Sequence, residues 1–294
     1  MIRKILFPVD FSPYCAAMAA YVQRAASIFG AEVALVHVCD LSSHNGFELY
    51  ARPATEIAKE HWELGQSKLE AFLASEFPPA TSPRYLLSGE APTRIVEAAN
   101  NHKFDLIVMP THAGRFRRFL LGSTTAKVLN DSQCPVLTTD HAATVTPRSF
   151  EYRNWVCALK LSSGSERVLR YARDAAHAVG ANLSVVHVID DHERGNRSNR
   201  LKEQARKALE RIAELQKIVG CEAPASVVIG PLKETLVEKV RRASADVLVI
   251  GRAVHGTNGH LEDLSYSLVR DSPCPVVSVR GVLGAEFTEK HVRI

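Results

Sequence analysis

The stretch "ALVHVCD" at residues 34–40 returns 150 residues later as "SVVHVID" at residues 184–190. The similarity extends around both stretches, because residues 5–38 align without a gap to residues 155–188. Each segment reads as an apolar strand, a serine-containing turn, an amphipathic helix that ends at glycine, and a second apolar strand. The chain therefore contains one strand–helix–strand unit twice.

The repeat continues to the end of each half. "DSQCPVLTT" at residues 131–139 returns as "DSPCPVVSV" at residues 271–279. A repeating unit of roughly 140 residues has the size of a domain rather than of a solenoid repeat. We therefore predict two homologous domains, joined by a polar linker and followed by a short tail. The expected bounds are 1–140 for the first domain, 141–152 for the linker, 153–281 for the second domain and 282–294 for the tail.

The apolar runs of each half predict the fold class. "ILFPV" at residues 5–9 is apolar almost throughout, as expected of a strand buried on both faces. The alternation of such runs with helical patterns predicts an α/β fold: two homologous, doubly wound parallel sheets of five strands, Rossmann-like in arrangement. The last strands, "PVLTT" at 135–139 and "PVVSV" at 275–279, would otherwise leave exposed edges. We expect them to meet, so that the domains pack as an intramolecular pseudo-dimer.

Serine and glycine mark the ends of the first helix in each domain. Ser12 is expected to cap this helix at its start and Gly30 to end it. In the second domain, Ser162 or Ser163 takes the capping position and Gly180 ends the helix. The two domains thus share their helix signals as well as their strands.

The composition of the chain argues against several classes of protein. The chain is 46% apolar and 23% charged, which is ordinary for a globular protein and argues against disorder. A net charge of +4 without long basic tracts gives no expectation of nucleic-acid binding. No apolar run is long enough to cross a bilayer or to form a signal-peptide core, so we expect a cytoplasmic protein. The six cysteines lack metal-ligand spacing and are expected to be reduced and packed, with no metal site.

Three segments of the first domain are expected to converge on one crevice. In doubly wound sheets, ligands bind beyond the carboxyl ends of the strands, where the strand order reverses. Asp10 ends the first strand, Val38 ends the second, and Gly-Ser-Thr at residues 122–124 opens the last helix. Free N–H groups, hydroxyls and the positive end of that helix would face the crevice, an arrangement that suits phosphate.

Each of these residues also has a purely structural interpretation. Asp10 alone is equally consistent with a cap on the first helix, and Gly122 with Ser123 is a common helix start. The histidines of the two matching strands, His37 and His187, are expected to be packed and hydrogen-bonded. In the loop before the last helix, His112 is interpreted as a hydrogen-bonding residue. The arginines of this loop, Arg115, Arg117 and Arg118, are interpreted either as a solvated face or as phosphate contacts.

The motifs of the first domain resemble those of the universal stress protein family. The resemblance rests on "ILFPVDFS", "ALVHV" and "IVMPTHAGRFRRFLLGSTTAKVLNDSQCPVL", and the whole chain resembles the tandem form of this family. It implies an adenine nucleotide alpha-hydrolase-like fold and a site for ATP or another adenine nucleotide, with Mg²⁺ as the accompanying ion. By this resemblance, the nucleotide would be held by Pro8, Val9, Asp10, Val38, Met109, His112, Ala113, Gly114, Arg115, Gly122, Ser123 and Thr124.

Both domains depart from the nucleotide-binding pattern of that family, which is Gly-x-x-Gly, a spacer, then Gly-Ser or Gly-Thr. Pro110 and Ala113 stand at the first two glycine positions, and the spacer is one residue short. In the second domain, Lys160 stands where the first domain has Asp10, and the acidic pair at 262–263 precedes the last helix. Carboxylates favour a helix start but repel phosphate. We therefore expect at most one nucleotide site, in the first domain.

These observations favour a stress-response binding or signalling module over an enzyme, because no residue is placed as a catalytic base. The alternatives are a nucleotide-free dimerising scaffold of the same fold and a slow ATPase. The expected partners are an adenine nucleotide and, through the last strands, each domain for the other; a homodimer is left open. Neither nucleic acid nor a membrane is expected as a partner.

Overall fold

A computed structural model describes most of the chain in six segments. These segments are residues 2–39, 54–111, 121–139, 152–190, 198–252 and 263–281. The described residues fall into two compact units. The N-terminal unit contains those between residues 2 and 134, and the C-terminal unit contains residues 135–139 together with those between 152 and 281.

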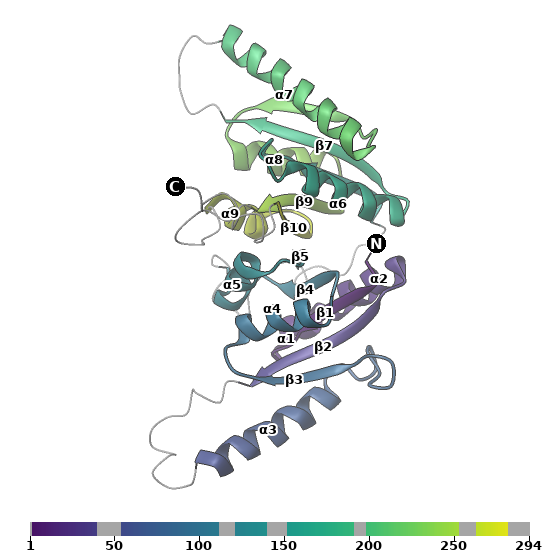
Figure 1. Cartoon of the computed structure of the whole chain (residues 1–294), viewed down its shortest axis with the longest axis vertical. Helices are drawn as coiled ribbons and strands as arrows, with labels where there is room; N and C mark the ends of the chain where they lie inside the picture. The colour runs from purple at the N-terminus through teal and green to yellow at the C-terminus, as the bar shows by residue number, and fades with distance from the viewer. Residues whose placement is uncertain are drawn as a thin grey trace, which may run out of the picture. The chain divides into compact units, whose positions relative to one another are not determined.

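The N-terminal unit alternates strands and helices, as the repeat predicts (Figure 1). Its strands β1 and β4 are buried along nearly their whole length, which explains why their sequences are apolar throughout. In chain order the elements are β1 (Lys4–Pro8), α1 (Pro13–Ala17), α2 (Ala19–Phe29), β2 (Glu32–Cys39), α3 (Ala54–Ala71), β3 (Arg84–Ser88), α4 (Ala91–Asn101), β4 (Leu106–Pro110) and α5 (Ser123–Asp131).

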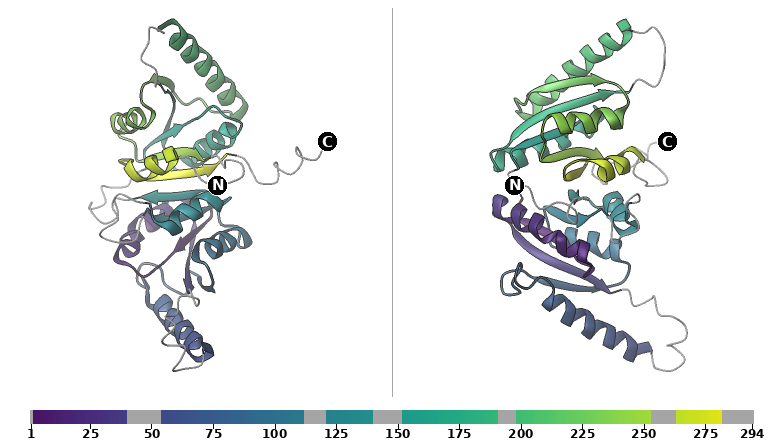
Figure 2. Two further views of the ribbon diagram at one scale, coloured as in Figure 1. Left: turned by 90° about the vertical axis from the view of Figure 1, so that its left-hand side faces the viewer. Right: turned by 180° about the vertical axis from the view of Figure 1, so that it is seen from behind.

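The strands of the N-terminal unit lie in the order β3-β2-β1-β4 and are parallel to one another. In register, Ile5 of β1 faces Val33 of β2 on one side and Leu106 of β4 on the other. Helix α2 packs on β1 and β2, while α4 contacts α5 and covers β2 and β3. Figure 1 shows α4 in front of the sheet, and the reverse view in Figure 2 shows α2 in front. The strand order reverses at β1, so the predicted crevice lies between the carboxyl ends of β1 and β4.

The start of the first helix confirms the predicted cap. Ser12 Oγ accepts a hydrogen bond from the Cys15 N–H at 3.1 Å, and Gly30 ends the second helical segment with φ 61°. The prediction of one continuous helix between these residues is wrong, because a turn at Met18 divides it into α1 and α2. Met18 is fully buried, so tertiary packing takes precedence over local helical propensity at this point.

The C-terminal unit repeats this plan and also contains the last strand of the first repeat. Figure 1 shows α6 in front of its sheet, and the reverse view in Figure 2 shows α8 in front, so the two helices cover opposite faces. In chain order the elements are β5 (Val136–Thr139), β6 (Asn154–Ala158), α6 (Ser165–Ala178), β7 (Asn182–Ile189), α7 (Ser198–Val219), β8 (Ala225–Ile229), α8 (Leu232–Arg242), β9 (Val247–Arg252), α9 (Asp263–Asp271) and β10 (Val276–Arg280).

The strands of the C-terminal unit lie in the order β5-β10-β9-β6-β7-β8. The two last strands meet, as predicted: β5 pairs with β10 in antiparallel orientation, with Leu137 opposite Val277. All four residues of β5 are buried. Each repeat thus supplies five strands of a doubly wound α/β fold, as predicted, and the antiparallel pair of β5 and β10 joins the last strands of the two repeats. A strand that would be an unpaired edge finds its hydrogen-bond partners there.

The start of α6 differs from the prediction. The helix begins at Ser165 with Gly164 as its N-cap, and neither Ser162 nor Ser163 caps it through a side chain. Instead, the Ser162 N–H donates to Ser165 Oγ at 3.0 Å. Gly164 lies against Gly281, so close that an added Cβ would stand 2.4 Å from the Gly281 Cα. This close backbone approach leaves no room for a side chain at the N-cap of α6.

Three further observations concern the described residues. None of their helices combines the length and the apolar character needed to cross a bilayer. The six cysteines are free thiols, all of them buried apart from the half-buried Cys39. The described part of the chain contains no cluster of histidine, cysteine and acidic side chains with the geometry of a metal site.

Candidate functional site

A cavity of about 220 Å³ opens at the carboxyl edge of the N-terminal unit's sheet. Its walls come from the ends of β1, β2 and β4, from α1 and α4, and from the first turn of α5. It therefore lies at the point where the strand order reverses, which is where ligands of doubly wound sheets bind. Three segments that are far apart in the sequence meet in it, as the sequence predicts.

The backbone after β1 is fixed by hydrogen bonds on both sides. The Val9 N–H donates to the Val36 carbonyl at 2.8 Å, and His37 Nδ1 lies 2.8 Å from the Val9 carbonyl, which it reaches as a donor. The ring of Phe11 packs against His37 with centroids 4.2 Å apart. His37 thus fixes the cavity wall, and it is packed and hydrogen-bonded through Nδ1, as expected.

The same arrangement recurs in the second repeat. His187 Nδ1 lies 2.8 Å from the Leu159 carbonyl, and the Leu159 N–H donates to Val186 at 2.9 Å. The two matching histidines therefore have one structural role, which is to tie the second strand of a repeat to the residue that follows the first. This explains why the repeat preserves them without implying that either is catalytic.

Asp10 stands at the rim of the cavity. One of its carboxylate oxygens, Oδ1, accepts a hydrogen bond from the Ser12 N–H at 2.9 Å, which fixes the turn into α1. The side chain is exposed, and a carboxylate can accept several further hydrogen bonds. Asp10 is therefore both a turn residue and an available acceptor for a ligand.

Cys15 forms part of the cavity wall as a neutral thiol. It is buried, and its Sγ donates to the Pro8 carbonyl at 3.6 Å. Burial raises the pKa of this thiol to about 12, so it is protonated at neutral pH. A protonated, buried thiol packs as a small apolar group rather than acting as a nucleophile.

Two hydrogen bonds hold the start of α5 against the end of β4. The Gly122 N–H donates to the Thr111 carbonyl at 2.8 Å, and Thr125 Oγ1 donates to the Pro110 carbonyl at 3.0 Å. Gly122 is the N-cap and has no side chain that could accept the N–H groups of the first turn. The N–H groups of a first helical turn have no partner inside the helix, and the positive end of the helix dipole lies with them at the cavity mouth.

The cavity combines an apolar floor with a polar rim. The side chains of Val9, Val36, Ile95 and Met109 are at most 5% exposed, whereas Asp10 and Ser123 are exposed. Such a cavity can enclose a flat, largely apolar ring and leave an anionic group at the start of α5. Its volume is below the roughly 300–1,000 Å³ of complete small-molecule sites. It therefore suits one part of a ligand whose remainder lies outside.

Most of the predicted binding residues line this cavity. They are Pro8, Val9, Asp10, Val38, Met109, Gly122, Ser123 and Thr124. The other four, His112, Ala113, Gly114 and Arg115, lie outside the described residues, as do Arg117 and Arg118.

Several wall residues have no sequence signal that points to the cavity, among them Cys15, Ile95 and Thr125. The amphipathic pattern of 91–101 indicates that Ile95 faces the core, but it does not show which end of the sheet α4 covers.

The corresponding edge of the C-terminal unit has different chemistry. Lys160 stands where Asp10 does in the first repeat, and an ammonium group donates hydrogen bonds but cannot accept them. Gly251 takes the place of Pro110, and an added Cβ there would already meet Val168 Cγ2 at 3.0 Å. Glu262 lies outside the described residues, and the side chain of Asp263 is likewise not described.

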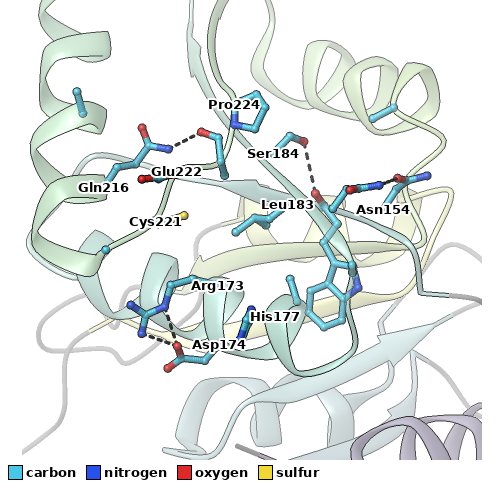
Figure 3. A pocket seen from close by; sticks show the side chains of 18 of the residues that line it. Asn154, Arg173, Asp174, His177, Leu183, Ser184, Gln216, Cys221, Glu222 and Pro224 are labelled. Carbon is cyan, nitrogen blue, oxygen red and sulfur yellow. Dashed lines mark hydrogen bonds and ion pairs between the residues drawn. The ribbon is translucent and has the colours of Figure 1, made fainter.

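A larger groove, of about 1,410 Å³, lies in the C-terminal unit along the ends of α6 and α7 and the starts of β6 and β7 (Figure 3). Two of its polar side chains pair with protein groups: Arg173 Nε donates to Asp174 at 2.7 Å, and Gln216 Nε2 donates to the Ala223 carbonyl at 2.5 Å. The groove is open and lies at the amino ends of the strands, opposite to the edge where such folds bind ligands. We therefore place the candidate site in the smaller cavity.

Comparisons with known proteins agree with the fold. The sequence model of the universal stress protein family matches residues 1–139 and again residues 151–280. A universal stress protein of Methanocaldococcus jannaschii is 32% identical over 46% of this chain and 80% of its own. One of Thermus aquaticus is 32% identical over 47% of this chain and 98% of its own.

Solved structures extend the similarity to nearly the whole chain. The crystal structure of a universal stress protein from Archaeoglobus fulgidus superposes with a TM-score of 0.64, at 24% identity, over 95% of this chain and 98% of its own. A functionally unknown protein from Pseudomonas aeruginosa gives a TM-score of 0.62 at 15% identity, over 95% and 93% of the two chains. At such identities these structures establish a shared fold.

Proposed function

Because this chain belongs to the universal stress protein family and contains the family's domain twice, we propose that it is a stress-response binding module with one adenine-nucleotide site, in the N-terminal unit. The observation that supports this proposal is the cavity between β1 and β4, which has an apolar floor, a carboxylate at its rim and a helix start at its mouth. The domain bounds given above and the assignment of the site to one unit belong to the same proposal.

The base would occupy the apolar part of the cavity. An adenine ring has two apolar faces, which match the buried side chains of Val9, Val36 and Met109. Its exocyclic amine is a donor, and the Asp10 carboxylate at the rim retains acceptor capacity beyond its bond to Ser12. The amine–carboxylate bond would orient the ring.

The phosphates would lie at the start of α5. The N–H groups of Ser123 and Thr124 belong to its first turn, where the helix leaves its donors without internal partners and the dipole favours negative charge. The Ser123 hydroxyl is exposed beside them. Pro110, at the first family glycine position, has no N–H to add, so we expect weak binding, in the micromolar to millimolar range.

Nucleotide extraction and titration test the proposal. Protein purified quickly should release an adenine nucleotide on denaturation, and calorimetric titration with ATP and Mg²⁺ should give measurable heat. Asp10→Ala and Ser123→Ala should abolish that heat or weaken binding about tenfold, whereas the matched change in the other unit, Lys160→Ala, should leave it unchanged. Heat that survives both changes in the N-terminal unit but is lost in Lys160→Ala would place the site in the C-terminal unit.

A second candidate function is a nucleotide-free scaffold. It is favoured by the pairing of β5 with β10, which joins the last strands of the two repeats through backbone hydrogen bonds. Absence of both extracted nucleotide and titration heat would establish this alternative. Release of inorganic phosphate from ATP in the presence of Mg²⁺, at a rate that Asp10→Ala abolishes, would instead indicate a slow ATPase.

A further inference from the structure

An ion pair between α4 and α5 stands beside the proposed nucleotide site. The ammonium of Lys127 on α5 contacts Glu90 Oε1, and Thr93 Oγ1 donates to Glu90 Oε2 at 2.7 Å. Glu90 is the N-cap residue of α4, and the next residue, Ala91, lines the cavity. Figure 1 shows α4 and α5 as neighbours in the N-terminal unit.

Lys127 is placed to reach the phosphate end of the site. It follows Ser123 and Thr124 by one helical turn, and both of these residues line the cavity. Side chains on a helix lean toward its N-terminus, so a lysine at this position extends back toward the first turn. Its contact with Glu90 is consistent with this direction, because Glu90 lies at the start of the neighbouring helix.

The charges around the cavity make this lysine important for an anionic ligand. Asp10 and Glu90 are both exposed and would repel an approaching phosphate. Arg94, on the same helix as Glu90, donates to the Ser88 carbonyl at 2.9 Å and to Glu97 at 2.7 Å, so its guanidinium already has partners. The described residues that line the cavity include no lysine or arginine, so the ammonium of Lys127, one helical turn after Ser123 and Thr124, is a positive charge that a phosphate there can use.

The pair with Glu90 is suited to exchange. The Lys127 and Glu90 side chains are 57% and 56% exposed, and exposed ion pairs are weak. The hydrogen bond from Lys127 lowers the pKa of Glu90, and the same bond raises the pKa of Lys127, so both groups are charged at neutral pH. A phosphate at the start of α5 would carry more negative charge than one carboxylate and would compete for the same ammonium.

Building on the proposed nucleotide site, we propose that Lys127 positions the ligand's phosphate and that Glu90 competes with this phosphate for the Lys127 ammonium. The two partners of one ion pair then have opposite effects on binding. Loss of Lys127 removes a favourable charge, whereas loss of the Glu90 charge frees the ammonium and removes a repulsive carboxylate. A pair that merely holds α4 against α5 would act in one direction, because breaking it from either side would loosen the wall.

Titration of the full-length chain with ATP and with adenosine separates these cases. Lys127→Met should weaken ATP binding about two- to fivefold, and Glu90→Gln should tighten it by a similar factor, the range of an exposed ion pair. Neither change should affect adenosine, which has no phosphate. The gain in Glu90→Gln should shrink as the salt concentration rises.

The C-terminal unit supplies a matched control. There, Lys233 on α8 contacts Asp271 on α9, so an ion pair also joins the two corresponding helices. Lys233→Met should leave the affinity for ATP and for adenosine unchanged.

Weaker or unchanged ATP binding in Glu90→Gln would overturn the inference while leaving the nucleotide site intact. Equal weakening of ATP and adenosine in Lys127→Met would do the same. If the wild-type chain binds neither ligand, the proposed function itself fails, and this inference fails with it.

Discussion

The bond between Thr125 and Pro110 ties the first turn of α5 to the end of β4, and its removal is a quantitative test of how the cavity wall is held. Thr125 is 4% exposed, and its Oγ1 donates to the Pro110 carbonyl at 3.0 Å. Thr125→Val keeps the shape of the side chain and removes only the donor. The change therefore isolates the hydrogen bond that ties the helix start to the end of β4.

The expected cost follows from the environment of this bond. An intramolecular hydrogen bond contributes about 0.5–1.5 kcal/mol, and a buried acceptor left unsatisfied adds to the loss. The Pro110 carbonyl belongs to a half-buried residue, so water can satisfy it only in part. We expect the N-terminal unit to lose about 1–2 kcal/mol of unfolding free energy, a fall of roughly 3–10 °C in Tm.

Urea unfolding followed by tryptophan fluorescence measures this loss. Trp62, on α3, is the tryptophan of the N-terminal unit, and Trp155→Phe as a common background removes the signal of the other unit. Thr124→Val is the matched control: it makes the same chemical change one residue earlier, where the half-buried hydroxyl has no protein partner within the described segments. If Thr125→Val is no less stable than Thr124→Val, the bond does not hold the start of α5.

Two further predictions concern packing and pH. Gly164→Ala should lower the unfolding free energy of the C-terminal unit by about 1–3 kcal/mol, because the added Cβ would stand 2.4 Å from the Gly281 Cα. Thermal unfolding measures this loss, and Ser163→Ala, which changes an exposed neighbour, should be nearly neutral. Equal stability of the two variants would contradict the close approach. The Cys15 thiol has a pKa of 9.0 in the unfolded chain, and burial raises this pKa to about 12 in the folded chain. The contribution of the thiol to the free energy of unfolding is therefore fully present below pH 9 and falls as the pH rises toward 12. Urea unfolding across this range should show a smaller decline in Cys15→Ala, and an identical decline would refute the raised pKa.

The repeat allows the element order and the place of the site to be predicted from the sequence. Strand and helix signals are local, since they arise from apolar periodicity and capping within a few residues. Parallel strands all present their carboxyl ends at one edge, so Asp10, Val38 and residues 122–124 could be assigned to one crevice without any knowledge of packing. The cavity contains all of them. That a nucleotide binds there stays a prediction.

The tertiary structure alone decided the features that depend on contacts between elements. The turn at Met18 and the start of α6 at Ser165 override local signals, because burial and close backbone approach involve residues far apart in the chain. The contact between Glu90 and Lys127 joins residues 37 positions apart on two different helices. Periodicity reports which face of each helix is buried, but the side-by-side position of two helices is set by how both pack on the sheet. The sequence therefore determined the location of the candidate cavity, and the folded structure determined which charges surround it.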